Sequence, residues 1–304
     1  MKFERAYCIE LKRIITPYTA RELYFDEDGE FFGTKLNFQC EDKECRKELI
    51  SVGAYREKKT KRALHFRSKD AKEHICNCND ESKDKSGKKL GKDDSFKITK
   101  FPEEFILNPL KTKNMGGSIS EIDEEEGNKS NKATNSAGLG ISTKYNKYRI
   151  SSFEHLVDCF TSGDEKILKN QNLTINGKTK KFVKFFKPVK YYKDEEGLIY
   201  YGKVGSIKKY GKNYSIYFED RVQIDGEYKH ISIYITEELI DKFSRRKLFR
   251  QQLDDLIKNI NDVNINCYFV GVYPEVKTYK VNDIEKTSIS VDLEDLRHFV
   301  LNYI

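Results

Sequence analysis

Four of the chain's seven cysteines lie in one window that runs from Cys40 to Cys78, and two of its five histidines lie there as well. Zinc is held by four thiolate or imidazole ligands in a tetrahedron, and two ligands a few residues apart can reach it from a single turn of chain. Cys40-x4-Cys45 is one such pair. His74, Cys76 and Cys78 offer a second pair, so the residue types predict a metal site.

The preferred ligand set is Cys40, Cys45, His74 and Cys78. His74-x3-Cys78 has the more usual spacing, because side chains two residues apart on an extended chain point in opposite directions. Cys76 competes for the last position. Four protein ligands leave no place for a reacting water, so we expect a structural Zn²⁺. Two alternatives stay open, namely ordinary reduced thiols and a Cys76-x-Cys78 redox pair.

The same window, "FQCEDKECRKEL…LHFRSKDAKEHICNC", resembles the N-terminal zinc-binding module of competence protein CoiA-like proteins over about residues 5–80. Cys40 and Cys45 match the first pair of that pattern, His65 its middle element, and His74 with Cys78 its last pair. The resemblance implies a bacterial DNA-processing or phage-defence setting and a restriction-type nuclease beyond the module. The segment "SFEHL" is similar to the helix that opens that nuclease, but the lysine expected one turn later is absent.

A restriction-type nuclease needs an Asp and a Glu-x-Lys on adjacent strands, where the carboxylates hold Mg²⁺ and the lysine steadies the attacking water. One match occurs in the second half: Asp262, followed by Glu275 and Lys277 in "YPEVK". Pro274 disfavours strand pairing at that point, and an Asp is ordinary in a loop. The nuclease is therefore the alternative hypothesis, and an exposed strand end is the simpler one.

Basic and aromatic residues cluster in the second half. The segment 178–193 holds seven lysines and five aromatic residues, a mixture that suits phosphate contacts combined with base stacking. The simpler interpretation is that the lysines solvate strand faces while the aromatic residues pack the core. The candidate nucleic-acid contacts are Lys180, Lys181, Lys184, Lys187, Lys190, Tyr191, Tyr192, Lys208, Lys209, Arg245, Arg246 and Arg250.

The elements that would position these residues can be expected from periodicity. Alternation predicts strands within residues 3–38, 180–192, 197–210, 213–222, 229–235, 265–281 and 286–293. A helix is expected over residues 151–160, with a capping box formed by Ser151 and Glu154. A long helix is expected over 236–260 and a short one over 293–303. Residues 79–95 and 111–142 have no hydrophobic period and are expected to be a disordered insertion and a flexible linker.

These elements predict an α+β protein with two domains in its 304 residues. We expect a β-rich zinc module over residues 1–110 and, over 143–304, an antiparallel domain with one long helix that fits a small OB-like barrel. Only 38% of the residues are hydrophobic and 35% are charged, so polar linkers must accompany the cores. The opening residues carry charges throughout and no apolar stretch approaches membrane length, which predicts a cytoplasmic protein.

The sequence therefore favours a nucleic-acid-binding protein, DNA or RNA, with a structural zinc and no catalytic group. The formal charge of +7 agrees with an anionic partner. Two alternatives come from other classes. One is the Mg²⁺-dependent nuclease, and the other is a protein-binding adaptor that uses the acidic run Glu121–Glu126.

Overall fold

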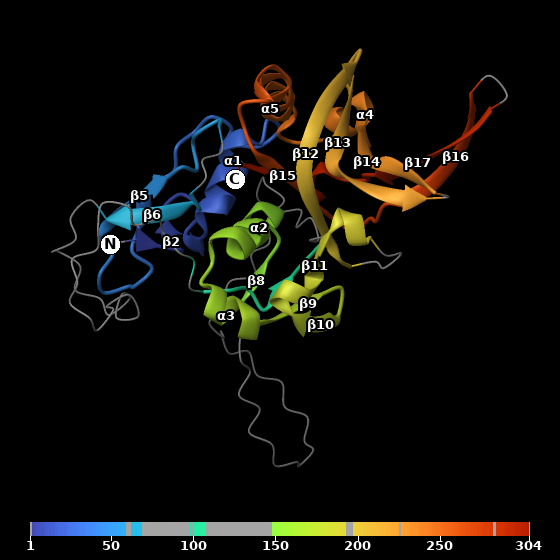
Figure 1. The fold of residues 1–304 in the computed structure, drawn as a ribbon. Coiled ribbons are helices and arrows are strands. Elements are labelled where there is room, and N and C mark those ends of the chain that lie inside the picture. The colour runs from blue at the N-terminus through green and yellow to red at the C-terminus, as the bar shows by residue number, and fades with distance from the viewer. Residues whose placement is uncertain are drawn as a thin grey trace, which may run out of the picture.

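The computed structural model describes residues 2–58, 62–68, 98, 100–107, 148–192, 197–224, 226–281 and 284–303. The protein is mixed α+β, with more strand than helix, and its strands form three sheets (Figure 1). Within the described ranges, no helix has the length and apolar character needed to cross a membrane.

The N-terminal part forms a six-stranded antiparallel sheet with the order β1-β6-β5-β4-β2-β3. The N-terminal part also contains the helix α1, Pro17–Phe25, in a stretch where only strands were expected. Thr16 caps α1 by accepting a hydrogen bond from the Thr19 amide at 3.2 Å, and Pro17 stands at its first turn. The strands are β1 (Lys2–Phe3), β2 (Ala6–Cys8), β3 (Arg13–Ile15), β4 (Phe38–Gln39), β5 (Glu48–Val52) and β6 (His65–Ser68).

A four-stranded sheet with the order β10-β9-β7-β8 joins segments from both sides of residues 108–147. Phe105 packs in one core with Ile150 and Phe153. The sheet therefore crosses the boundary expected near residue 110, because Ile98, Phe101, Phe105 and Leu107 pack with the later part of the chain. The elements are β7 (Glu104–Phe105), β8 (Arg149–Ile150), α2 (Phe153–Ser162), α3 (Glu165–Asn170), β9 (Asn172–Ile175) and β10 (Lys178–Lys181).

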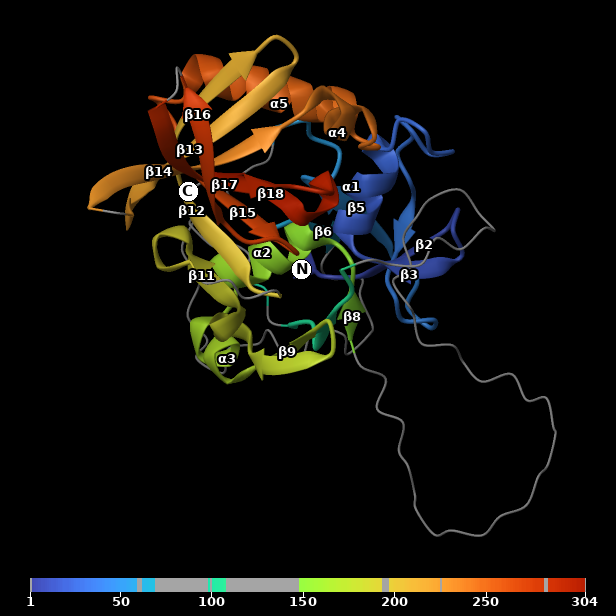
Figure 2. The same ribbon diagram turned by 90° about the vertical axis from the view of Figure 1, so that its right-hand side faces the viewer.

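The third sheet has the order β16-β17-β14-β13-β12-β15-β18, with β11 paired to β12. Its pairs are antiparallel except β14–β17 and β11–β12, which are parallel. β15 pairs with β12, and β16, four residues further along the chain, pairs with β17. This stretch therefore runs from one side of the sheet to the other, and the sheet curls around a core of its own (Figures 1 and 2).

The elements of this part are β11 (Phe186–Pro188), β12 (Ile199–Tyr210), β13 (Asn213–Ile224), β14 (Glu227–Ile235), α4 (Glu237–Asp241), α5 (Arg246–Asn259), β15 (Ile265–Val270), β16 (Glu275–Val281), β17 (Ile284–Asp292) and β18 (Phe299–Tyr303). The single long helix expected over 236–260 was wrong, since residues 242–245 separate α4 from α5. The short helix expected over 293–303 was also wrong. One 3-10 turn, Leu296–His298, leads into β18, which pairs with β15.

The strand expected over residues 180–192 was wrong as well. The chain forms β10, a 3-10 turn at Phe182–Phe185, β11 and a second 3-10 turn at Val189–Tyr191. The buried residues Phe182, Phe185, Phe186 and Val189 are spaced at intervals of three and four, which is a helical period. The helix expected over 151–160 was confirmed as α2. It starts after Ser152, so Ser151 and Glu154 do not hold the capping-box positions.

Candidate functional site

Cys40 and Cys45 lie together in the loop between β4 and β5. The Cys40 amide donates to the Lys47 carbonyl at 2.8 Å, and a turn around Asp42 brings the Cys45 amide to the Asp42 carbonyl at 3.2 Å. Both side chains are buried. Burial raises the pKa of the Cys40 thiol to about 11, and the adjacent Cys45 adds to the rise. Bound Zn²⁺ selects the thiolate form of such thiols, so the pair fits half of a zinc site.

The other expected ligands, His74, Cys76 and Cys78, lie outside the described residues. Ser68, the last residue of β6, pairs with Leu49 at the same end of the sheet as Cys40, which follows Gln39, the partner of Glu48. Across the described ranges, no group of three or more His, Cys, Asp and Glu side chains is placed to hold a metal ion.

His65 is at the opposite end of β6 from the cysteine pair. It pairs with Val52, five residues along β5 from Lys47, which is about 16 Å at strand spacing. Its Nδ1 lies 3.2 Å from the Ala63 carbonyl, and burial lowers its pKa. His65 therefore serves the packing of β6 rather than the cysteine loop.

The structure does not place the three nuclease candidates on adjacent strands. Asp262 lies in the turn after α5, where its amide donates to the Asn259 carbonyl at 3.0 Å. Glu275 and Lys277 lie on β16, and four strands separate β16 from β15 in the sheet order. The ammonium of Lys277 bonds to Asp292. This geometry does not favour the Mg²⁺ nuclease.

Five lysines lie along β10, β11 and the two 3-10 turns beside them. We call them the lysine ridge: Lys180, Lys181, Lys184, Lys187 and Lys190. No Asp or Glu occurs between residues 176 and 192. The phenylalanines of this segment are buried, as the simpler interpretation held. Tyr192 packs on the core of the third sheet. Tyr191 remains 58% exposed, and the Lys187 and Lys190 ammonium groups lie 5.8 and 5.3 Å from its ring centroid.

Four of the other cations expected to contact phosphate are engaged with carboxylates. Lys209 pairs with Asp254 at 2.8 Å, on the side of β12 that faces α5. The three arginines pair with carboxylates of three different elements: Arg245 with Glu154 at 3.7 Å, Arg246 with Asp28 at 2.9 Å, and Arg250 with Asp241 at 2.8 Å. Lys208 is the exception, because it points to the other side of β12.

That other side is a surface which our sequence reasoning missed. On β13 and β14 the core takes Ile216, Phe218, Ile231 and Ile233, so alternation turns their neighbours outward. The register places Tyr217 opposite Ser232 and Ser215 opposite Tyr234. We call this surface the tyrosine face; it comprises Ser206, Lys208, Tyr210, Ser215, Tyr217, Arg221, Tyr228, His230, Ser232 and Tyr234.

The tyrosine face exposes flat rings beside cationic groups. Tyr210, Tyr228 and Tyr234 are 49%, 68% and 43% exposed. The Lys208 ammonium lies 5.3 Å from the Tyr217 ring centroid, and a hydrogen bond with Tyr210, followed by burial, raises the pKa of Tyr217. Within the part of the chain that the structure describes, Lys208 and Arg221 form no ion pair. Alternation in "NYSIYFEDRV" was the available signal, but tyrosines occupy both faces of that strand.

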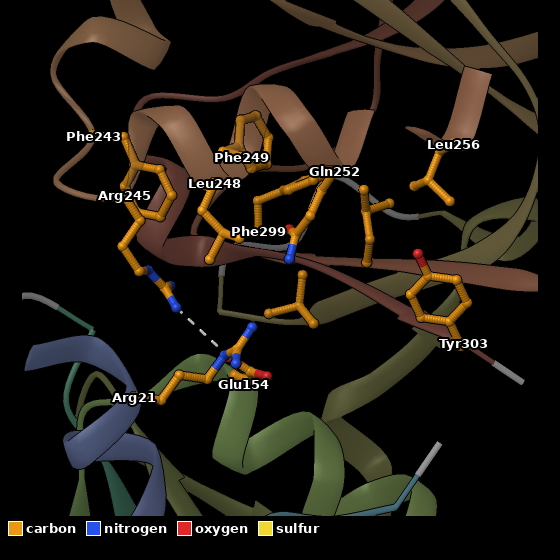
Figure 3. A pocket seen from close by; sticks show the side chains of 12 residues that line it. Arg21, Glu154, Phe243, Arg245, Leu248, Phe249, Gln252, Leu256, Phe299 and Tyr303 are labelled. Atoms are coloured by element: carbon orange, nitrogen blue, oxygen red, sulfur yellow. Dashed lines mark ion pairs between the residues drawn. The ribbon is translucent and has the colours of Figure 1, made fainter. Parts of the chain in front are cut away.

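A separate polar centre joins the N-terminal part to the rest of the protein (Figure 3). Arg21 of α1 and Arg245 approach the same Oε2 atom of Glu154, on α2, at 3.6 and 3.7 Å. They border a cavity of about 60 Å³ whose other walls come from Phe243 and from residues of α5 and β18, which are mostly apolar apart from Gln252 and Tyr303. Arg21 also donates to the Ala54 carbonyl at 3.1 Å. We call Arg21, Glu154 and Arg245 the inter-module joint.

A cleft of about 350 Å³ adjoins the joint. Its charged lining has both signs, namely the carboxylates of Glu22, Asp26, Glu154, Glu294 and Asp295 and the cations of Lys242, Arg245 and Arg297. Because cations and carboxylates both line the cleft, with five carboxylates to three cations, the cleft does not present a surface of one sign to a ligand. Its residues come from both ends of the chain, which fits a joint rather than a binding site.

No family model matches this sequence, and no curated protein matches it significantly.

Proposed function

We propose that this protein binds single-stranded nucleic acid on the tyrosine face of an OB-like barrel, beside a module stabilised by a structural zinc. The order of elements supports the barrel. β12, β13 and β14 form a meander, α4 and α5 follow, β15 returns to β12, and β17 lies parallel to β14. OB folds bind oligonucleotides on the face of their second and third strands, which correspond here to β13 and β14.

The exposed tyrosines of the tyrosine face carry the proposal. Tyr217 and Tyr234 are diagonal neighbours on adjacent strands, since each stands opposite the serine two residues from the other, and Tyr210 and Tyr228 extend the row. An unpaired base stacks on an aromatic ring with about 1–3 kcal/mol per base, whatever its identity. A duplex hides its base faces. The face therefore suits a single strand, with little preference for sequence.

Phosphate contacts would come from two places. Lys208 and Arg221 stand among the tyrosines, and the lysine ridge supplies a second group of cations, on a segment whose sequence has no Asp or Glu between residues 176 and 192. The half-buried hydroxyl of Ser232 adds a hydrogen-bonding group for sugar or phosphate oxygens. Counterion release makes such binding fall with salt, by a slope of about 0.7 per phosphate for single strands.

The zinc would be held by Cys40, Cys45, His74 and one of Cys78 or Cys76. Its role would be structural. The cysteine loop joins β4 to β5, so a metal there would fix the edge of a sheet whose strands are only two to five residues long. Zinc with four protein ligands supplies folding free energy and no reacting water.

The test measures fluorescence anisotropy of labelled oligo(dT) and oligo(U), with a duplex for comparison, at several salt concentrations and with or without Mg²⁺. Tyr234→Ala should weaken single-strand binding about five- to a hundredfold, the loss of one stacked base. Phe32→Ala is the matched control, because Phe32 is 48% exposed on another module, and it should leave affinity unchanged. Wild-type affinity for single strands that is no greater than for duplex, or equal losses in both variants, would contradict the proposal.

A further inference from the structure

The loop after α1 sits on the first turn of α5, where the N-terminal part meets the third sheet (Figure 2). The Glu27 amide donates to the Ser244 carbonyl at 2.8 Å, and the Glu27 carboxylate accepts from the Lys247 amide at 2.6 Å. The Arg246 guanidinium donates two hydrogen bonds to the Asp28 carboxylate, of 2.9 and 3.0 Å. Two carboxylates of one module thus occupy the start of a helix in another.

The surface they occupy is the most basic part of α5. "RRKLFR" places Arg245, Arg246, Lys247 and Arg250 within six residues, and no side chain of α5 itself caps the helix. A bidentate arginine binds carboxylate and phosphate with the same fork of donors. The Asp28–Arg246 pair therefore uses the contact that a phosphodiester would make.

The two carboxylates differ in how firmly they are held. The Glu27 side chain is 4% exposed and is fixed by the helix amide, whereas the Asp28 side chain is 66% exposed. Exposed ion pairs are weak and are screened by salt. An incoming polyanion can therefore replace Asp28 on Arg246 while Glu27 keeps the loop in place.

The path from the tyrosine face to this surface is short along the chain. β14 carries Tyr234 and runs directly into α4, whose last residue, Asp241, pairs with Arg250 of α5 at 2.8 Å. The tyrosine face lies on the side of the sheet away from α5, so a single strand bound there would have to pass around the end of β14 and α4 to contact the start of α5.

We propose that Asp28 is an autoinhibitory contact that masks Arg246, a phosphate-binding residue on the basic start of α5, and that nucleic acid displaces it. This inference rests on the proposed function for its ligand. It gives a reason why Arg246, one of the arginines expected to contact phosphate, is paired with an exposed carboxylate of the N-terminal part.

The experiment compares Asp28→Asn with wild type in the oligo(dT) titration. The variant should bind about two- to fivefold more tightly, the range of one exposed ion pair, and its salt slope should steepen by about 0.7, one added phosphate. Glu165→Gln is the matched control, because it also removes one exposed carboxylate from an ion pair, with Lys169 at 2.6 Å. It should change neither quantity.

Elution from immobilised heparin separates this inference from the proposed function, since heparin has no bases to stack on tyrosine. Asp28→Asn should elute at higher salt than both wild type and Glu165→Gln. If wild type fails to bind oligo(dT) but the heparin shift is seen, the tyrosine face is wrong and the masking stands. Equal elution of Asp28→Asn and Glu165→Gln would overturn the masking.

Discussion

Glu154→Gln removes the shared carboxylate of the inter-module joint while keeping its shape. Glu154 and Arg21 have side-chain exposures of 11% and 3%, and Arg245 of 17%. The substitution would leave two guanidinium groups facing each other with their common counter-charge gone. Such a change is costly because the remaining charges cannot regain their hydration.

Breaking a buried ion pair costs about 3–5 kcal/mol. Here the expected loss is about 2–4 kcal/mol, because Arg245 is partly hydrated and Arg21 keeps its carbonyl partners. Urea unfolding followed by tyrosine fluorescence measures it, since the chain has 19 tyrosines and no tryptophan. The transition midpoint should fall, and protease should cut the N-terminal part at lower urea than in wild type.

The control is Glu165→Gln, whose carboxylate is 79% exposed and whose loss should leave the unfolding midpoint close to that of wild type. A double-mutant cycle of Glu154→Gln with Arg245→Met should give a coupling free energy above about 0.5 kcal/mol. If Glu154→Gln unfolds like Glu165→Gln, or the cycle shows no coupling, the joint does not hold the modules and the reasoning from burial is refuted.

Two further predictions concern pH and metal. His155 is buried against Tyr18 with ring centroids 4.4 Å apart, and burial lowers the pKa of His155 from 6.5 to about 3. Between pH 6.5 and 3, His155 is therefore protonated in the unfolded chain but not in the folded protein. The free energy of unfolding should fall as pH drops through this range. His155→Phe should flatten that fall in urea unfolding curves, and a fall of unchanged slope would show that His155 is not its source. Purified protein should contain about one zinc per chain, and Cys40→Ser should lose it while Cys8→Ser, in the same module, retains it; a folded Cys40→Ser protein that keeps its full metal content would exclude Cys40 as a ligand.

The candidate site was only partly predictable. The lysine ridge was found because seven lysines in a short segment are visible without any fold. The tyrosine face was not, because Tyr214 turns into the core while Tyr217 turns out. Alternation puts the two on opposite faces, and the structure shows which face is covered by the core. The carboxylate partner of Arg246 could not be predicted for a related reason: Asp28 is 218 residues away from Arg246 in the chain.

The spacing of residues along the sequence was enough to predict the elements that depend mainly on neighbouring residues. α2 and the long strands β12, β13 and β14 follow from apolar periodicity, and the cysteine pair from ligand type. The tertiary structure decided the rest. β18 forms a strand because β15 offers it a partner, and residues 98–107 join the later sheet through β9. Hydrogen-bond partners and counter-charges of this kind come from distant parts of the chain, so no local window of the sequence contains them.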